Sequence, residues 1–584
     1  MKKFGSFTRL FHYLKPYRFR FALVIVMTVL SVMASALLPT VMGFPLTEIS
    51  KNVFANQAIN FPYIQKMLGL VLLVGIVYGV AQLLAGVIMT NVVQSAMKDL
   101  RQEIDQKINR LPVSYFDRQK QGDILSRVTN DVDAVSGAMQ QAFIGILQAI
   151  LGIIFAIIMM SVINPKMALI ACIMIPTSWW VSRMIVKRSQ KYFDQMQQSL
   201  GAMNGFVQEN MTGFSVLKMY GLEKQTVAGF HKVNHQLRSY GFKATVISGL
   251  MMPLVQLISY LTYIVIAVIG TQNVIAGVLV VGQLQAFVQY IWQVSQPLGN
   301  ITQLAPVLQS ASAASARVFG FLDEAEETHQ AETQHFPEEV KGTVTFENVS
   351  FAYQPDKPLI QDFNLQVKAG QTVAIVGPTG AGKTTLINLL MRFYEVTAGA
   401  IKIDGVDIKT VSRQEVRALF GMVLQDAWLY EDTIAENIRF GQLTASDYEV
   451  VDAAKAANVD HFIRTMPNSY EMVINAEGEN ISLGQKQLLT IARAILANPK
   501  ILILDEATSS VDTRLEQLIQ KAMEKVMQGR TSFVIAHRLS TIREADLILV
   551  LNQGAIVEQG THDSLLAEGG FYSQLYNSQF AEEE

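Results

Sequence analysis

The sequence is poor in charge and has a single cysteine. Asp, Glu, Lys and Arg make up 16% of its 584 residues, and hydrophobic residues make up 50%. A chain of this length exceeds one ordinary domain, and its mean hydropathy of +0.26 suits a membrane part joined to a soluble part. Cys172 has no partner for an intramolecular disulfide, and its apolar surroundings favour simple packing. The net charge of −2 argues against nucleic acid as a partner.

Charged residues are missing from five windows, 21–47, 67–97, 134–165, 167–182 and 244–316. A helix needs about 20 apolar residues to cross a bilayer. The first four windows can each hold one crossing, and the fifth can hold two, with a break near 270–277. We therefore predict a transmembrane domain over residues 1–321 with six crossings, near 21–47, 67–95, 140–163, 167–186, 247–269 and 278–298.

The basic residues favour one orientation. They are concentrated at the N-terminus and in the connections 98–133 and 183–243, whereas the other loops are short and carry only three lysines. Under the positive-inside rule both termini and the two long connections are cytoplasmic, in a multi-pass protein of the cell membrane. The first residues alternate aromatic and basic side chains, which predicts an interfacial helix over 4–17 and no cleavable signal.

The middle of each predicted crossing lacks charged residues, which disfavours an ion-coupled transporter. Several methionines, aromatic residues and glutamines lie there instead. Helix packing explains any one of them, but as a set they suit an adaptable, uncharged cavity for hydrophobic compounds. They are Met159, Met160, Met251, Met252, Trp179, Trp180, Tyr260, Tyr263, Gln256, Gln285, Gln289 and Gln293.

The C-terminal part has the pattern of a soluble α/β domain. An acidic stretch over 322–342 predicts a linker. From residue 343 to 584, alternating or buried runs such as TVTFENVSFAY, QTVAIVG and ILILDEA predict strands. The predicted fold class is an all-α membrane domain of six helices with long cytoplasmic extensions, fused to an α/β domain.

The segment GPTGAGKTT fits the phosphate-binding pattern G-x-x-x-x-G-K-[ST] between a strand and a helix. Its glycines let backbone N–H groups face phosphate oxygens. Lys383 would hold the β- and γ-phosphates of ATP, and the Thr384 hydroxyl would coordinate Mg²⁺. The segment, called the phosphate loop below, comprises Gly377, Pro378, Thr379, Gly380, Ala381, Gly382, Lys383, Thr384 and Thr385.

The run ILILDEAT delivers two carboxylates at the end of a buried strand. Asp505 is placed to hold Mg²⁺, and Glu506 to orient or activate the attacking water. The alternative, that both cap the following helix, is less favoured. The pair therefore predicts ATP hydrolysis in addition to ATP binding, which completes the predicted fold class as a membrane domain fused to an α/β P-loop ATPase domain.

These motifs make the whole chain resemble a half-transporter of the ABC exporter superfamily. The resemblance implies that Tyr353 in SFAY stacks on adenine and that Gln425 in GMVLQDAWLY senses Mg²⁺ and the membrane domain. It further implies that Asp512 in SSVD acts across the dimer and that His537 in FVIAHRLST contacts the γ-phosphate. Segments 111–132 and 208–225 resemble the cytoplasmic connections whose short helices press on the nucleotide domains.

One motif departs from the family pattern. Where the family has Leu-Ser-Gly-Gly-Gln at a helix start, this chain has Ile481, Ser482, Leu483, Gly484 and Gln485. In the family this loop binds the γ-phosphate of ATP held by the partner's phosphate loop. The Leu483 side chain should hinder that approach. This chain thus resembles the catalytically competent half of a heterodimeric bacterial multidrug exporter, whose partner lacks the catalytic carboxylate.

We therefore predict ATP-driven export of hydrophobic or amphipathic compounds by a heterodimer in the membrane lipid. The leading alternative is a homodimeric lipid flippase, in which Leu483 is a tolerated substitution. A nucleotide-gated channel or regulatory subunit shares the fold, but the uncharged crossings disfavour it. Peptide export with leader cleavage is also disfavoured, because no protease domain precedes the first crossing.

Overall fold

The computed structural model describes residues 9–327, 334–354, 356–424, 427–475, 480–505, 513–536 and 539–579. Its contacts divide the chain into two compact units. The first contains the chain up to Arg110 and Gln119–Glu324, and the second contains Leu111–Arg118 and the chain from Ala325 onward.

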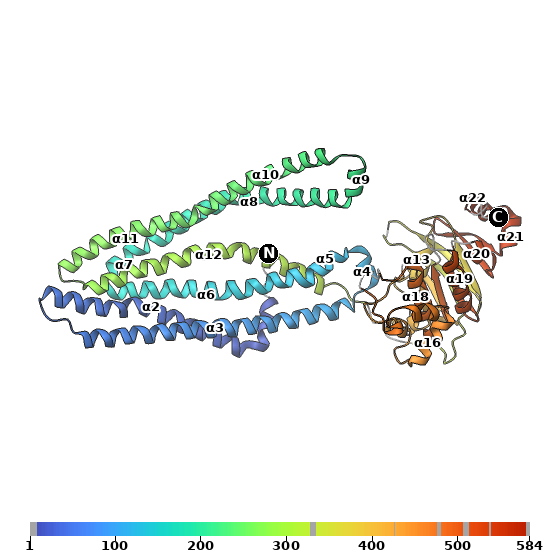
Figure 1. The fold of residues 1–584 in the computed structure, drawn as a ribbon, viewed down its shortest axis with the longest axis horizontal. Coiled ribbons are helices and arrows are strands. Elements are labelled where there is room, and N and C mark those ends of the chain that lie inside the picture. The colour runs from blue at the N-terminus through green and yellow to red at the C-terminus, as the bar shows by residue number, and fades with distance from the viewer. Residues whose placement is uncertain are drawn as a thin grey trace. The chain divides into compact units, whose positions relative to one another are not determined.

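The first unit is made of long helices (Figure 1). Among the described residues, five helical stretches are long and apolar enough to cross a membrane, namely Arg9–Phe54, Phe61–Ile108, Gln121–Ile163, Pro165–Thr212 and Glu223–Ile275. The sixth predicted crossing, 278–298, overlaps α12 (Val281–Leu322) from residue 281 onward. After helical residues 9–14, called the N-terminal helix below, come η1 (Lys15–Tyr17), α2 (Arg18–Phe54), α3 (Phe61–Ile108), α5 (Gln121–Ser126), η2 (Arg127–Asp131), α6 (Val132–Ile163), α7 (Pro165–Cys172), α8 (Met174–Thr212), α9 (Phe214–Met219), α10 (Glu223–Gly249), α11 (Met251–Ile275) and α12 (Val281–Leu322).

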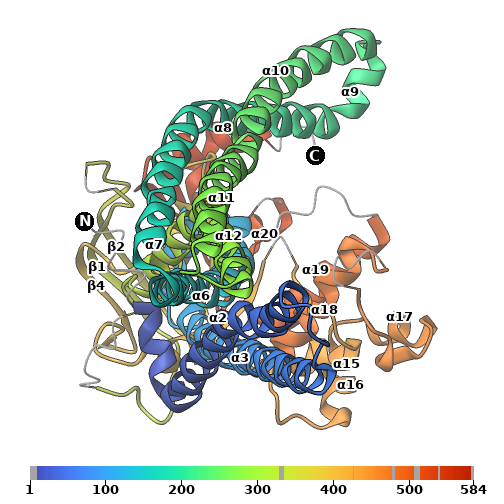
Figure 2. The same ribbon diagram turned by 90° about the vertical axis from the view of Figure 1, so that its left-hand side faces the viewer.

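These helices form a bundle and a separate hairpin. Helices α2, α3, α6 and α12 pack against one another. Helices α8 and α10 pair with each other instead, and they extend away from the bundle to a tip at α9 (Figures 1 and 2). Helix α11 then returns the chain to α12. The hairpin thus leaves much of its surface uncovered within this chain.

Two glycines allow α2 and α12 to cross at backbone contact. A Cβ atom built on Gly282 would lie 1.9 Å from the Gly43 carbonyl oxygen, and one on Gly43 would lie 2.5 Å from the Gly282 oxygen. Helices in a bilayer gain stability from such close approach, because lipid supplies no hydrophobic drive for association. Neither glycine can be replaced without moving a helix.

Buried hydrogen bonds add specificity to the bundle. The Tyr290 hydroxyl on α12 donates to the Ala36 carbonyl oxygen on α2 at 2.6 Å. The hydroxyls of Ser259 and Ser295 lie 2.6 Å apart and join α11 to α12. Each such bond contributes about 0.6 kcal/mol on average in a membrane protein. The polar side chains of the crossings therefore serve partly as packing contacts.

The second unit contains two sheets and their helices. The four-stranded sheet has the order β2-β1-β4-β5, and the six-stranded sheet has the order β10-β9-β3-β8-β7-β6, in which only β10 is antiparallel to its neighbour. The strands are β1 (Val344–Phe351), β2 (Ile360–Val367), β3 (Thr372–Val376), β4 (Ala398–Ile403), β5 (Val406–Asp407), β6 (Phe420–Val423), β7 (Ile501–Asp505), β8 (Thr531–Ile535), β9 (Leu547–Asn552) and β10 (Ala555–Gly560). The helices are α4 (Val113–Arg118), α13 (Lys383–Leu390), α14 (Arg413–Ala418), α15 (Ile434–Arg439), α16 (Asp447–Ala456), α17 (Asp460–Thr465), η3 (Ser469–Glu471), α18 (Leu483–Ala497), α19 (Thr513–Met527), α20 (Leu539–Arg543), α21 (His562–Glu568) and α22 (Phe571–Gln579).

The buried strands of the six-stranded sheet contribute side chains to two hydrophobic cores, one on each face. Successive side chains of a strand point to opposite faces. Ile375, Ile503 and Phe533 pack toward β1, β2, β4 and α13, whereas Ala374 and Leu504 pack toward α15, α16 and α18. A sheet covered on both faces fits its continuous apolar strands. The predicted fold class, a helical membrane domain fused to an α/β ATPase domain, is confirmed.

We predict that Gly282→Val destabilises the membrane unit. The added side chain overlaps the Gly43 backbone, so α2 and α12 must separate, at a cost of about 1–3 kcal/mol. The thermal unfolding midpoint in detergent measures this. Gly75→Val is the matched control, because a Cβ at Gly75 meets nothing within 4 Å. Equal midpoints for the two variants would contradict the close crossing.

Candidate functional site

The phosphate loop lies between β3 and α13, and the β9–β10 turn supports it. Gly377 has a φ of 153°, and a Cβ there would lie 2.2 Å from the Leu551 carbonyl oxygen. The Gly554 N–H donates to the Ala381 carbonyl oxygen at 3.0 Å. These contacts with the β9–β10 turn fix the backbone of the phosphate loop. Gly382 then forms the N-cap of α13, so the free N–H groups of the first helical turn border the loop.

Lys383 lies within the loop. Its ammonium donates to the Gly377 carbonyl oxygen at 2.7 Å and to the Pro378 carbonyl oxygen at 3.2 Å. Burial lowers the pKa of Lys383, and the negative charge of Asp505 opposes that shift. The interaction places the Asp505 carboxylate near this lysine.

Strand register explains why Asp505 reaches the loop. Asp505 on β7 and Ile375 on β3 both pair with Ile535 on the intervening strand β8. They are therefore separated by two strand spacings, about 10 Å. Because these strands are parallel, their carboxyl ends meet at one edge of the sheet. Sequence segments more than 100 residues apart thus supply the two halves of the site.

Tyr353 belongs to an aromatic cluster beside the loop. Its ring packs edge-on against Phe351 and Tyr394, with centroid distances of 4.9 and 5.0 Å. The hydroxyls of Tyr353 and Thr385 lie 3.2 Å apart. Tyr353 remains 40% exposed, so the cluster orients the ring and leaves surface for stacking.

Tyr394 also contacts the first cytoplasmic connection. Its hydroxyl donates to Asp117 on α4 at 2.6 Å, within the second unit. Burial raises the pKa of Tyr394, and the hydrogen bond to Asp117 raises it further. Sequence reasoning missed Tyr394, although it follows the helix after the phosphate loop in the run MRFYE.

The altered motif begins α18. Ser482 is its N-cap, and the Gln485 N–H donates to the Ser482 hydroxyl at 3.4 Å while the Ser482 N–H donates to the Gln485 side-chain oxygen at 2.8 Å. This reciprocal pair forms a capping box. Leu483 is the first residue of the helix and is 43% exposed, whereas Gly484 is buried. The substitution thus places an isobutyl group on the surface at a helix N-terminus.

Four predicted site residues lie outside the described residues, namely Gln425, Glu506, Asp512 and His537.

Hydrogen bonds of Asn437 and Arg493 hold the described segment around Tyr430 in place. The Asn437 side chain accepts from the Tyr430 N–H at 2.8 Å, and Arg493 donates to the Asn437 carbonyl oxygen at 2.9 Å. Burial lowers the pKa of Arg493.

The membrane unit contains an uncharged polar pocket of about 430 Å³, called the amide-lined pocket below. Four glutamines line it, Gln82, Gln148, Gln293 and Gln296, together with Ser31, Ser35 and Tyr78. Of the residues expected from sequence, Gln293 lies here and donates to the Ser35 carbonyl oxygen at 3.0 Å. Met160 and Met251 are buried in packing. The other three glutamines were missed because amide residues in apolar runs give no periodic signal.

These residues fit a nucleotide. The loop offers backbone N–H groups and an ammonium to phosphates, and the half-exposed Tyr353 ring offers a face to a base. The exposed Thr384 hydroxyl and the nearby Asp505 carboxylate are oxygen donors, the ligand type that Mg²⁺ prefers. A P-loop ATPase joined to a bundle of apolar helices defines the class of an ATP-driven membrane transporter.

Comparison with known proteins agrees with this class. The family model "ABC transporter transmembrane region" matches residues 21–298, and the model "ABC transporter" matches residues 360–509. A fatty acid ABC transporter ATP-binding/permease protein of Mycobacterium bovis is 46% identical over 524 residues, covering 90% of this chain and 83% of that protein. An ATP-dependent lipid A-core flippase of Syntrophus aciditrophicus is 32% identical over 583 residues, covering 100% and 96%.

A solved structure of a bacterial Atm1-family ABC exporter with ATP bound is also similar. It has a TM-score of 0.76 and 28% identity, and the match covers 96% of this chain and 98% of that one. The chain belongs to the ABC transporter family. It is an ABC exporter half-transporter, a multi-pass membrane protein that binds ATP and couples its hydrolysis to transport.

We predict that Tyr353→Ala weakens ATP binding by about 5- to 150-fold, because base stacking on an aromatic ring contributes about 1–3 kcal/mol. Tyr353→Trp should retain most of the affinity. Titration of the full chain with a fluorescent ATP analogue measures both. Tyr448→Ala is the control, because Tyr448 is an exposed tyrosine of the same unit. Equal loss in both alanine variants would contradict a stacking role.

We also predict that ATP affinity falls as pH rises. Burial sets the pKa of Lys383 below its ordinary value of 10.5, and bound phosphates favour the charged form and so raise this pKa. Affinity is therefore full below the pKa of the nucleotide-free protein and declines as pH rises through it. Dissociation constants from about pH 7 to about pH 10 measure the slope. Lys383→Arg keeps its charge and should flatten the profile; an unchanged slope would contradict the assignment.

Proposed function

We propose that the chain is the catalytically competent half of a heterodimeric exporter of hydrophobic or amphipathic compounds, including drugs. Its partner would be a second half-transporter with a degenerate catalytic carboxylate. The transporter would lie in the cell membrane with both termini cytoplasmic, as the distribution of Lys and Arg indicates.

One observation carries this proposal. The phosphate loop with Lys383 and the Asp505 carboxylate lie at one edge of the sheet, whereas the start of α18 presents Leu483 on the surface. In the family that the sequence resembles, the start of the corresponding helix binds the γ-phosphate of the ATP that the partner's phosphate loop holds. The chain would thus have an intact nucleotide site of its own and would contribute an altered surface to the nucleotide site of its partner.

The chemistry at the nucleotide site of this chain would follow from the residue types. Lys383 and the N-terminus of α13 would hold the phosphates, and Thr384, Gln425 and Asp505 would hold Mg²⁺, which neutralises developing phosphate charge. Glu506 would orient the attacking water, and His537 would contact the γ-phosphate. Ser482, Gly484, Gln485 and Asp512 would act at the dimer interface. Tyr394 and Asp117 would transmit the state of the site to the first cytoplasmic connection.

The hairpin of α8 and α10 supports a dimer. Four apolar side chains near its tip, Met211, Phe214, Met219 and Tyr220, are more than half exposed. Apolar surface of this kind in a polar setting marks a protein interface. The amide-lined pocket of about 430 Å³ supports an uncharged substrate, because it offers hydrogen bonds and no fixed charge. Membrane lipid surrounds the crossings.

A homodimeric lipid flippase is the second candidate. The names of the relatives favour it, since one is a fatty acid transporter and another is a lipid A-core flippase. In that case Leu483 would be a tolerated substitution, and both sites of the dimer would hydrolyse ATP.

The test is ATPase activity in lipid of this chain alone and of this chain co-purified with a candidate partner half-transporter. The proposal expects activity only in the pair. We predict that Glu506→Gln in this chain then lowers turnover at least about 100-fold, the scale for loss of a catalytic base, while ATP binding persists. Full activity of the chain alone would favour the homodimer. Wild-type turnover in Glu506→Gln would refute the assignment of that base.

A further inference from the structure

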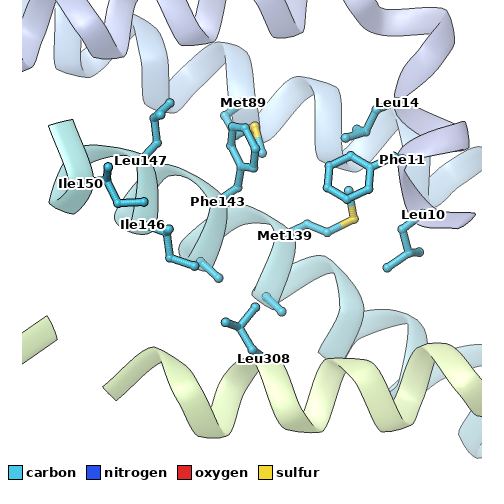
Figure 3. Close-up of a pocket in the computed structure, with 12 residues that line it drawn as sticks. Leu10, Phe11, Leu14, Met89, Met139, Phe143, Ile146, Leu147, Ile150 and Leu308 are labelled. Carbon is cyan, nitrogen blue, oxygen red and sulfur yellow. The ribbon is translucent and has the colours of Figure 1, made fainter. Parts of the chain in front are cut away.

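The first unit contains an apolar cavity of about 290 Å³ beside the N-terminal helix (Figure 3). Its twelve lining residues are all hydrophobic and come from the N-terminal helix, α3, α6 and α12. Leu14, Met89, Phe143, Ile146 and Leu308 lie around it (Figure 3). It is distinct from the amide-lined pocket, which shares none of these residues.

A cavity with this lining calls for an apolar occupant. The lining offers a water molecule none of the two to four polar partners that it needs. An unfilled hollow also loses dispersion contacts along its wall. Phe11 and Ile150, which line it, are each 49% exposed, so the cavity is open at its side to the surface of the unit.

The length of the cavity suits one acyl chain. Its lining residues on α6 run from Ala138 to Ile150, a rise of about 18 Å along the helix. The hydrocarbon core of a bilayer is about 30 Å thick, so one leaflet spans about half of that. An acyl chain of one leaflet therefore matches the long dimension of the cavity.

Polar contacts hold the N-terminal helix and the adjoining η1 over the cavity. The Tyr13 hydroxyl donates to Glu103 on α3, and the Tyr17 hydroxyl donates to Asp99 at 2.9 Å. Arg9 pairs with Asp323 after α12 at 2.7 Å and lies over the Phe319 ring. The helix thus turns its bonded polar side chains to α3 and α12, and Leu10 and Leu14 to the cavity.

Exposed cations follow this helix directly. Lys15, Arg18 and Arg20 are all exposed, whereas three nearby carboxylates, Asp99, Glu103 and Asp323, already accept hydrogen bonds. Clusters of Lys and Arg at a membrane surface attract anionic lipid head groups. The charge beside the cavity therefore complements an anionic head group.

We propose that this cavity binds one acyl chain of an anionic membrane phospholipid, whose head group meets Lys15, Arg18 and Arg20. The site is separate from the amide-lined pocket, which the proposed function assigns to the exported compound. The bound lipid completes the apolar packing between the N-terminal helix and α6.

The test uses the full chain in lipid nanodiscs, alone and assembled with its partner. Phosphatidylglycerol with a photoactivatable acyl chain is added, and cross-linked peptides are mapped. Labels are expected at Phe11, in 139–150 and at Leu308. Ile146→Trp fills the cavity and should reduce labelling at least about fivefold. Ile154→Trp is the control on the same helix, because Ile154 is exposed and does not line the cavity.

A second part of the experiment varies charge and tests whether the lipid head group contributes to binding. Phosphatidylcholine with the same photoactivatable chain should label weakly, and Lys15→Gln with Arg18→Gln should remove the preference for phosphatidylglycerol. Lys232→Gln with Arg238→Gln removes two exposed cations of α10 as a control. Equal labelling by both lipids, or labelling by a free photoactivatable fatty acid alone, would overturn the proposal. So would wild-type labels elsewhere, or loss of the labels on assembly, which would assign this face to the partner subunit.

Discussion

The support of the phosphate loop by the β9–β10 turn is the constraint on which the nucleotide site depends. The Leu551 carbonyl oxygen occupies the space that a side chain at 377 would fill, and the Gly554 N–H holds the Ala381 carbonyl. With the loop fixed in this way, α13 starts at the loop and Lys383 folds back over it. Parallel register with β8 then brings Asp505 to the same edge. The binding geometry is thus built into the sheet before any nucleotide arrives.

A short series of side-chain contacts joins the phosphate loop to the first cytoplasmic connection. Thr385 lies against the Tyr353 hydroxyl, Tyr353 packs on Tyr394, and Tyr394 donates to Asp117 on α4. All of them belong to one compact unit, even though α4 lies more than 200 residues before the ATPase domain in sequence. A nucleotide that changes the orientation of Tyr353 would therefore act on α4, which ends at Arg118 just before the chain enters the membrane unit at Gln119.

Sequence predicts the parts of this protein that local patterns encode. Charge-free windows indicate membrane helices, and the strand–loop–helix context of residues 372–390 identifies the phosphate loop, because each pattern reports a local physical requirement. Sequence could not predict three features: the Gly43–Gly282 crossing, the Tyr394–Asp117 hydrogen bond and the amide-lined pocket. Each depends on helix rotation or on contacts between distant segments, which periodicity does not specify. The roles of Gln425, Glu506, Asp512 and His537 remain predictions from motif position.

The central claim is that the two nucleotide sites of the transporter are unequal, since a phosphate loop that holds Lys383 and an exposed Leu483 occur in one chain. The most direct measurement is the number of ADP molecules that vanadate traps per dimer after turnover, with the labelled chain identified. The account predicts one ADP per dimer, held by this chain. Two ADP molecules per dimer, or one held by the partner, would contradict it.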